Sequence, residues 1–224
     1  MLKIWFLALR PWSFTASFIP VALGTALAAG QGFFDAGLFA LTLLAGIAMQ
    51  AGTNLINTYG DYQSGVDTVE AAVTCPQLVT GLLTPPAVKR AGIACFGLAS
   101  VIGLGLARLR GWPIIIIGLI GLIGGYCYTA GFSYKYKGLG SIMVFFLMGP
   151  LMTWPAYFIQ TAQYSWLPVL VSLPIGFLVA DILHANDLRD MVFDRQAGIH
   201  TLALFLGRRK SLLLHHSLPA ASFV

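Results

Sequence analysis

Long apolar stretches, separated by short polar or glycine- and proline-rich breaks, make up most of this 224-residue chain. A helix needs about 20 mainly apolar residues to cross the ~30 Å hydrocarbon core of a bilayer. Six stretches approach or exceed that length, and a seventh begins near Ser211 and runs to Val224. The six are Trp12–Gly30, Ala36–Thr58, Ala91–Ala107, Pro113–Gly131, Leu139–Ile159 and Trp166–Ala185. The pattern predicts an all-α polytopic transmembrane bundle, with about six full spans and a truncated seventh in one domain over residues 1–224.

The composition supports this prediction. Hydrophobic residues make up 58% of the chain and charged residues only 9%, whereas a soluble domain carries about 25% charged residues. Too few polar side chains are present to cover a water-facing surface. A soluble enzyme and a nucleic-acid-binding module are therefore excluded, and the first expected partner is the lipid bilayer.

The basic residues predict the orientation of these spans. With the N-terminus in the cytoplasm, eleven of the 13 Lys and Arg residues fall inside, and only Arg108 and Arg110 fall outside. Cytoplasmic loops of membrane proteins carry such an excess of positive charge. We expect an integral protein of a bacterial or archaeal inner membrane, with its N-terminus and its long polar loops cytoplasmic.

Two polar segments follow the second and sixth spans. In the first, Asn57 and Asp61 are four residues apart and so share one helical face, and Gly65 allows a turn that brings Asp67 back. In the second, Asn186, Asp190 and Asp194 also advance by four, with Asp187 beside them. An even number of crossings separates the two spans, so both segments are expected on one membrane face.

Carboxylates this close together repel one another unless a positive charge lies among them. Mg²⁺ prefers oxygen ligands and is typically held by one or two carboxylates together with substrate phosphates. Two such segments on one face therefore predict a diphosphate held through magnesium. The alternative is that the acids are solvated loop residues paired with Arg189 and Arg195.

The loop after the fourth span adds positive charge on the same face. Lys135 and Lys137 could neutralise phosphate oxygens there, and the Tyr128 hydroxyl could donate a hydrogen bond to them. Interfacial tyrosines with cytoplasmic lysines would look the same, so both interpretations stay open for the loop taken alone.

Several motifs in order along the chain resemble the UbiA superfamily of membrane prenyltransferases, and within it the branch that prenylates 1,4-dihydroxy-2-naphthoate in menaquinone biosynthesis. The most specific runs from Leu183 through Asn186-Asp187-Leu188-Arg189-Asp190 to Asp194. The others are Leu9-Arg10-Pro11-Trp12, Asn57 to Thr68, Thr80 to Pro85, and the loop from Tyr128 to Gly140.

The resemblance implies a helical fold around a central cavity, in which two Asp-rich motifs bind Mg²⁺ and the diphosphate of a polyprenyl donor. Residues expected to act in catalysis are Asp61, Asp190, Lys135 and Lys137. The expected metal ligands are Asp61, Asp67, Asp190 and Asp194. Expected to bind substrate are Asn57, Asn186, Asp187, Tyr128 and Arg189. An aromatic quinone precursor would be the acceptor, and no nucleic acid partner is implied.

The sequence departs from the family pattern in three places. Thr58 stands where the family usually has Asp, and the segment from Val73 to Gln77 lacks a basic residue usually found there. Members generally have nine helices, so the resemblance implies that the last two and most of the seventh are missing.

The expected function is Mg²⁺-dependent transfer of a polyprenyl group to an aromatic acceptor. A transporter with an ion path through Asp181, His184 and Asn186 is one alternative, and an inactive truncated remnant is another. A transferase of the CDP-alcohol type is disfavoured, because its D-x-x-D-G-x-x-A-R signature is absent from the sequence.

Overall fold

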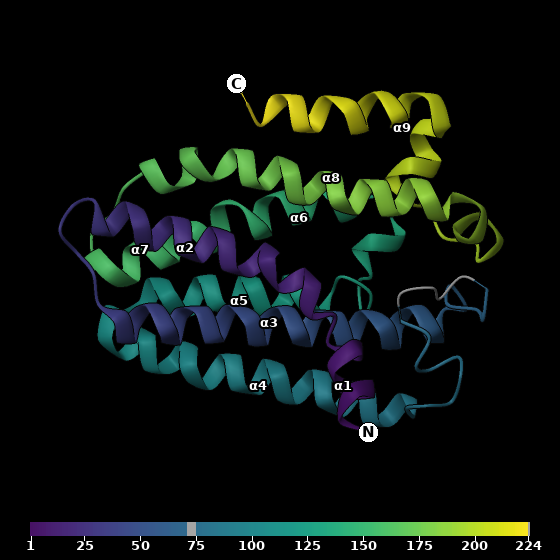
Figure 1. The fold of residues 1–224 in the computed structure, drawn as a ribbon, viewed down its shortest axis with the longest axis horizontal. Coiled ribbons are helices and arrows are strands. Elements are labelled where there is room, and N and C mark those ends of the chain that lie inside the picture. The colour runs from purple at the N-terminus through teal and green to yellow at the C-terminus, as the bar shows by residue number, and fades with distance from the viewer. Residues whose placement is uncertain (71–74, 224) are drawn as a thin grey trace.

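A computed structural model describes residues 1–70 and 75–223, and the regular elements within them are all helical. Most of the longer helices run along one common direction, with α4 on one side of the bundle and α9 on the other (Figure 1). The α-helices are α1 (Leu2–Ala8), α2 (Thr15–Ala29), α3 (Ala36–Gln63), α4 (Pro85–Arg110), α5 (Trp112–Tyr126), α6 (Gly140–Met148), α7 (Pro150–Thr161), α8 (Leu167–Gln196) and α9 (Leu202–Ala221), with short 3-10 helices at Pro11–Phe14 and Tyr134–Tyr136.

The helices agree with the predicted all-helical membrane fold. Among the described residues, five stretches are long and apolar enough to cross a bilayer: Pro11–Ala29, Ala36–Gln63, Pro85–Arg110, Gly140–Thr161 and Leu167–Gln196. The shorter apolar helix Trp112–Tyr126 corresponds to the expected fourth span. Large apolar side chains such as Val101, Leu119 and Ile123 are more than half exposed, as expected of side chains that face lipid rather than water. The number of crossings stays a prediction.

Two expected helix boundaries differ from the structure. The expected fifth span is divided at Gly149, whose φ of −91° and ψ of −96° end α6 before Pro150 begins α7. A Cβ at Gly149 would lie 3.1 Å from the Ser172 backbone oxygen, so the close packing on α8 leaves no room for a side chain. The expected seventh span corresponds to α9, which begins at Leu202 rather than near Ser211 and has a kink at Gly207, where φ is 72°.

The fold brings three distant segments to one end of the bundle. The loop after α5 packs so tightly on α3 that a Cβ on Gly60 would lie 2.8 Å from the Thr129 side chain. The same loop meets the α8–α9 connection, where the His200 amide donates to the Tyr136 carbonyl over 3.1 Å. The C-terminal ends of α3 and α8 and the lysine-bearing loop therefore surround one space.

Candidate active site

A cavity of about 580 Å³ runs from this end of the bundle into its interior. Charged and amide side chains line one end, and apolar side chains line most of the remainder, reaching Leu106, Ile114 and Ile159. The polar lining consists mainly of Arg10, Asn57, Asp61, Asp67, Lys135, Asn186, Asp187, Arg189, Asp190 and Asp194. The cavity can therefore hold a molecule with a charged head and an apolar tail.

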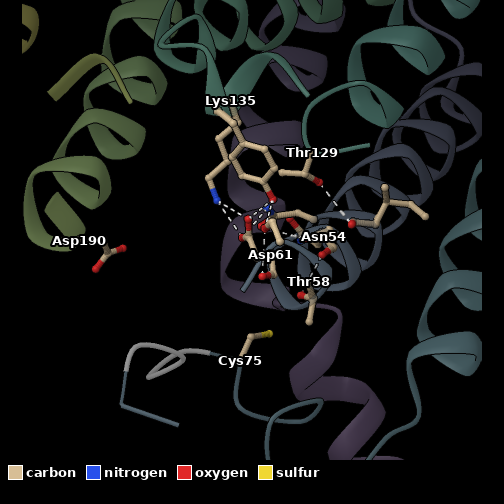
Figure 2. Close-up of polar contacts among 12 residues, drawn as sticks. Asn54, Thr58, Asp61, Cys75, Thr129, Lys135 and Asp190 are labelled. Carbon is tan, nitrogen blue, oxygen red and sulfur yellow. Dashed lines mark hydrogen bonds and ion pairs between the residues drawn. The ribbon is translucent and has the colours of Figure 1, made fainter. Parts of the chain in front are cut away.

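Asp61 lies at the centre of the polar end (Figure 2). Lys135 Nζ donates to both of its carboxylate oxygens, at 2.9 and 2.8 Å, and the Tyr136 hydroxyl donates to Oδ1 at 2.7 Å. Asn57 Nδ2, one helical turn away, donates to Oδ2 at 2.8 Å. Three donors thus hold a carboxylate whose side chain is only 6% exposed, which offsets the cost of burying it.

The loop groups around Asp61 keep their protons. Burial alone would lower the pKa of Lys135, but the charge of Asp61, its hydrogen bond with the ammonium, and the nearby Tyr136 and Asp187 together raise that pKa well above its usual value. Burial, reinforced by Asp61, likewise raises the pKa of the Tyr136 hydroxyl. Lys135 is therefore a cation and Tyr136 a neutral hydrogen-bond donor at neutral pH.

Arg10 is a site residue that the sequence reasoning placed only in a motif and in the charge count. Its guanidinium donates to Asn57 Oδ1 and Thr58 Oγ1, both at 3.0 Å, and to Cys75 Sγ at 3.1 Å. Its backbone has a φ of 55°, which is uncommon for a residue other than glycine. The three hydrogen bonds hold it in this conformation directly before Pro11. The sequence signal that could have identified Arg10 as a site residue was the motif Leu9-Arg10-Pro11-Trp12.

Arg10 and Asn57 link the N-terminus to Asp61. Because Asn57 accepts from Arg10 and donates to Asp61, its amide has one fixed orientation. Thr58, where the family usually has Asp, gives Arg10 a neutral acceptor. The segment from 73 to 77 was noted above for lacking a basic residue. Its positions 73 and 74 lie outside the described residues, and its Cys75 accepts a hydrogen bond from Arg10.

The second acidic segment faces the same cavity from α8. Asn186, Asp187, Asp190 and Asp194 all line it, and Figure 2 shows Asp190 on a different helix from Asp61. Asp190 accepts two hydrogen bonds of 2.7 Å from the neighbouring Arg189. Burial and then the charge of Asp61 raise the pKa of Asp67, across the cavity, to about 6.

The structure distinguishes the two lysines of the loop. Lys135 lines the cavity, whereas Lys137 is exposed outside it, with its ammonium 3.5 Å from the centre of the Phe132 ring. Lys135 lies within the short 3-10 helix Tyr134–Tyr136, whereas Lys137 follows its last residue. Tyr128 lines the cavity as expected.

The polar residues considered for an ion path do not form one continuous line. Asp181 contacts His215 Nδ1 of α9 at 2.8 Å, and His184 Nε2 lies 3.1 Å from the Ser211 carbonyl oxygen. Both contacts connect α8 to α9, and neither residue lines the cavity that Asn186 faces.

The donor set of the cavity fits Mg²⁺. The side chains of Asp61, Asp67, Asp190 and Asp194 all line the cavity and offer the hard oxygen ligands that this ion prefers. Within residues 1–70 and 75–223, no three acidic, His or Cys side chains are close enough to form a complete protein-only metal site. Mg²⁺ is commonly held by one or two carboxylates together with substrate phosphates.

Comparison with known proteins identifies the family of this chain. The profile of the UbiA prenyltransferase family matches residues 17–224. The chain belongs to this family. The resemblance inferred from the motifs is thereby confirmed.

Relatives of this UbiA family member come from bacteria and animals. It is 34% identical over 215 residues to the 1,4-dihydroxy-2-naphthoate octaprenyltransferase of Bacillus subtilis, an alignment covering 96% of this chain and 68% of the relative. It is 38% identical to the mouse UbiA prenyltransferase domain-containing protein 1, covering 95% of this chain and 64% of that protein. The chain thus spans less than two thirds of the length of the mouse relative.

The fold is also that of solved UbiA structures. The structure of a UbiA homologue from Archaeoglobus fulgidus bound to GPP and Mg²⁺ matches with a TM-score of 0.73 and 21% identity, covering 98% of this chain and 75% of that one. At this identity the likeness establishes the fold.

Proposed function

We propose that this UbiA family member transfers a polyprenyl group from its diphosphate to an aromatic acceptor in a Mg²⁺-dependent reaction. The observation that carries the proposal is the cavity itself, with facing carboxylates and a buried lysine at one end and an apolar interior beyond them. Burial of an isoprenoid tail is favourable by ~0.8 kcal/mol per CH₂ group. The archaeal structure with GPP and Mg²⁺ supports the same assignment.

The bond that breaks joins the allylic carbon of the donor to a diphosphate oxygen. The electron pair moves to that oxygen, so a group that catalyses the step must stabilise negative charge as it develops there. Lys135 is a cation at the polar end, and Tyr128 and Arg189 line the same space. We propose that these three side chains bind and orient the diphosphate.

Asp61 and Lys135 form an ion pair at the polar end of the cavity. When a diphosphate enters, Lys135 can exchange the Asp61 carboxylate for phosphate oxygens, which leaves Asp61 available to a cation. Magnesium, when bound, would supply further positive charge to the leaving group. The residues proposed to hold it are Asp61, Asp67, Asp190 and Asp194, with Asn57, Asn186 and Asp187 orienting them and the substrate.

For the acceptor we propose 1,4-dihydroxy-2-naphthoate, which places the protein in menaquinone biosynthesis. The electron-rich ring attacks the allylic carbon, and the carboxyl group leaves as CO₂. The Bacillus subtilis relative supports this choice. The excess of basic residues on one side supports a cytoplasmic position for the polar end of the cavity in an inner membrane.

Membranes containing the protein provide the test. They are supplied with octaprenyl diphosphate, 1,4-dihydroxy-2-naphthoate and Mg²⁺, and the prenylated product is measured by mass spectrometry. We expect product from the wild type and a loss of at least about 100-fold in Asp61→Asn. The matched control is Glu70→Gln, because Glu70 is an exposed acid in the same connection and does not line the cavity. No product from the wild type, or full activity in Asp61→Asn, would contradict the proposal.

A further inference from the structure

Tyr136 contacts both acidic segments of the site, one through its side chain and the other through its backbone. Its hydroxyl donates to Asp61 Oδ1 at 2.7 Å, near the end of α3. Its carbonyl oxygen accepts a hydrogen bond of 3.1 Å from the His200 amide in the α8–α9 connection. The preceding amide of that connection, from Ile199, donates to the Asp194 carbonyl oxygen at 3.1 Å. A short path of hydrogen bonds and backbone therefore joins Asp61 to Asp194 through Tyr136.

The backbone around Tyr136 is held against the α8–α9 connection and the start of α9. Lys137 and His200 pair as an isolated parallel β-bridge. Gly138 packs so closely on α9 that a Cβ there would lie 2.7 Å from the Phe205 ring. The Tyr136 hydroxyl therefore reaches Asp61 from a segment whose position is tied to the end of α8.

The three donors to Asp61 differ in how a bound diphosphate would affect them. Lys135 lines the cavity, and under the proposed function it exchanges Asp61 for phosphate oxygens. Asn57 lies on the same helix as Asp61, so it cannot set the position of Asp61 relative to α8. Tyr136 does not line the cavity, and its hydrogen bond to Asp61 can persist when a diphosphate is bound.

A tyrosine hydroxyl suits this role because it is a neutral donor. Its single proton is directed at Asp61, and Ser64 Oγ, 3.2 Å from the phenolic oxygen, can donate to it in turn. A hydrogen bond to a carboxylate is stronger than one between neutral groups, and a carboxylate has further lone pairs for other partners. Asp61 can therefore be held in one orientation while it stays an anion that a divalent cation can bind.

We infer that Tyr136 is a positioning residue, whose hydroxyl holds Asp61 in place relative to the acids of α8 after Lys135 turns to the diphosphate. The inference rests on the proposed function and adds to it a residue that acts through Asp61. Loss of the hydroxyl should therefore weaken the binding of the divalent cation far more than it weakens the binding of the prenyl donor.

Tyr136→Phe tests the inference by kinetics, because it removes the hydroxyl and keeps the backbone hydrogen bond. We expect the Mg²⁺ concentration for half-maximal transfer to rise by about tenfold, and the KM for octaprenyl diphosphate at saturating Mg²⁺ to change by less than about twofold. A merely structural role would reduce the amount of active protein, which lowers kcat and leaves the Mg²⁺ midpoint unchanged. The matched control is Tyr62→Phe, since Tyr62 is next to Asp61 in sequence, is exposed and does not line the cavity.

Mn²⁺ binding tests the same inference without turnover. Mn²⁺ binds to carboxylate and water oxygens as Mg²⁺ does, and its binding to the protein in detergent with inorganic diphosphate is measured by electron paramagnetic resonance. We expect Tyr136→Phe to bind Mn²⁺ about tenfold more weakly than the wild type, and Tyr62→Phe to bind it equally well. Equal Mn²⁺ affinity in the wild type and Tyr136→Phe would overturn the inference. If the affinities differ as expected but the wild type transfers no prenyl group, the proposed function fails while the role of Tyr136 in holding Asp61 stands.

Discussion

Lys135 Nζ lies 2.8 Å from Oδ2 and 2.9 Å from Oδ1 of Asp61, although 74 residues separate the two in sequence. The lysine side chain is 15% exposed and the aspartate side chain 6%. Each charge is therefore largely removed from water and depends on the other. The pair joins the end of α3 to the loop after α5, so it stabilises the fold and also holds two groups proposed to act on substrate.

Removing one member of this pair should destabilise the protein more than removing both. We expect Lys135→Met to cost about 3 kcal/mol of folding free energy, because an unpaired carboxylate is left buried. Adding Asp61→Asn should recover most of that loss without restoring prenyl transfer. The measurement is thermal unfolding in detergent, with Lys137→Met as the exposed control. Equal and additive losses in the two single variants would argue against the coupling.

The two lysines of the loop should differ in activity. Lys135 lines the cavity and Lys137 does not, so we expect Lys135→Gln to lower kcat by about 100-fold, as for the loss of a group that stabilises developing charge. Lys137→Gln should cause a far smaller loss. The rates are compared at saturating octaprenyl diphosphate. A larger effect at Lys137 would show that the loop turns differently during catalysis.

Much of this site could be predicted from the sequence. The four-residue spacings of Asn57 with Asp61 and of Asn186 with Asp190 placed each set on one helical face, and the parity of crossings placed both sets at one end of the bundle. All of these side chains line one cavity. Helix periodicity and span counting are local rules, and they hold here because the helices are long.

The remaining features depend on how distant segments pack. The choice of Lys135 over Lys137 depends on the short 3-10 helix Tyr134–Tyr136, which brings Lys135 to Asp61, and the spacing of the lysines does not encode this helix. The contact of Arg10 with Cys75 spans 65 residues and requires the path of the connecting loop. The division of the fifth span did have a signal, the pair Gly149-Pro150, since proline cannot continue a helix without losing a backbone hydrogen bond.

Arg10 should not be replaceable by lysine. Its guanidinium donates to three acceptors at once, and an ammonium group cannot reproduce that planar geometry. We expect Arg10→Lys to lower prenyl transfer by about tenfold or more, because Asn57 loses the partner that orients it toward Asp61. Arg90→Lys is the matched control, since Arg90 is exposed on α4 and its side chain donates to the Pro86 carbonyl.

The readout that identifies a positioning role for Arg10 is a double-variant comparison. If Arg10 acts through Asn57, then Arg10→Lys should have little further effect in an Asn57→Ala background. Independent effects of the two substitutions would instead indicate that Arg10 acts on substrate directly.

Magnesium dependence should respond to the acids of α8. EDTA should abolish transfer and added Mg²⁺ should restore it, because the carboxylates facing the cavity repel a diphosphate when no cation lies between them. In Asp190→Asn we expect half-maximal activity to require at least about tenfold more Mg²⁺, since one anionic ligand is lost. The folding free energy should barely change, because the Arg189–Asp190 pair is largely exposed, at 56% and 33%, and such pairs contribute about 0–1 kcal/mol. Glu70→Gln should leave the Mg²⁺ titration unchanged. A wild-type Mg²⁺ requirement in Asp190→Asn would remove this residue from the proposed ligands.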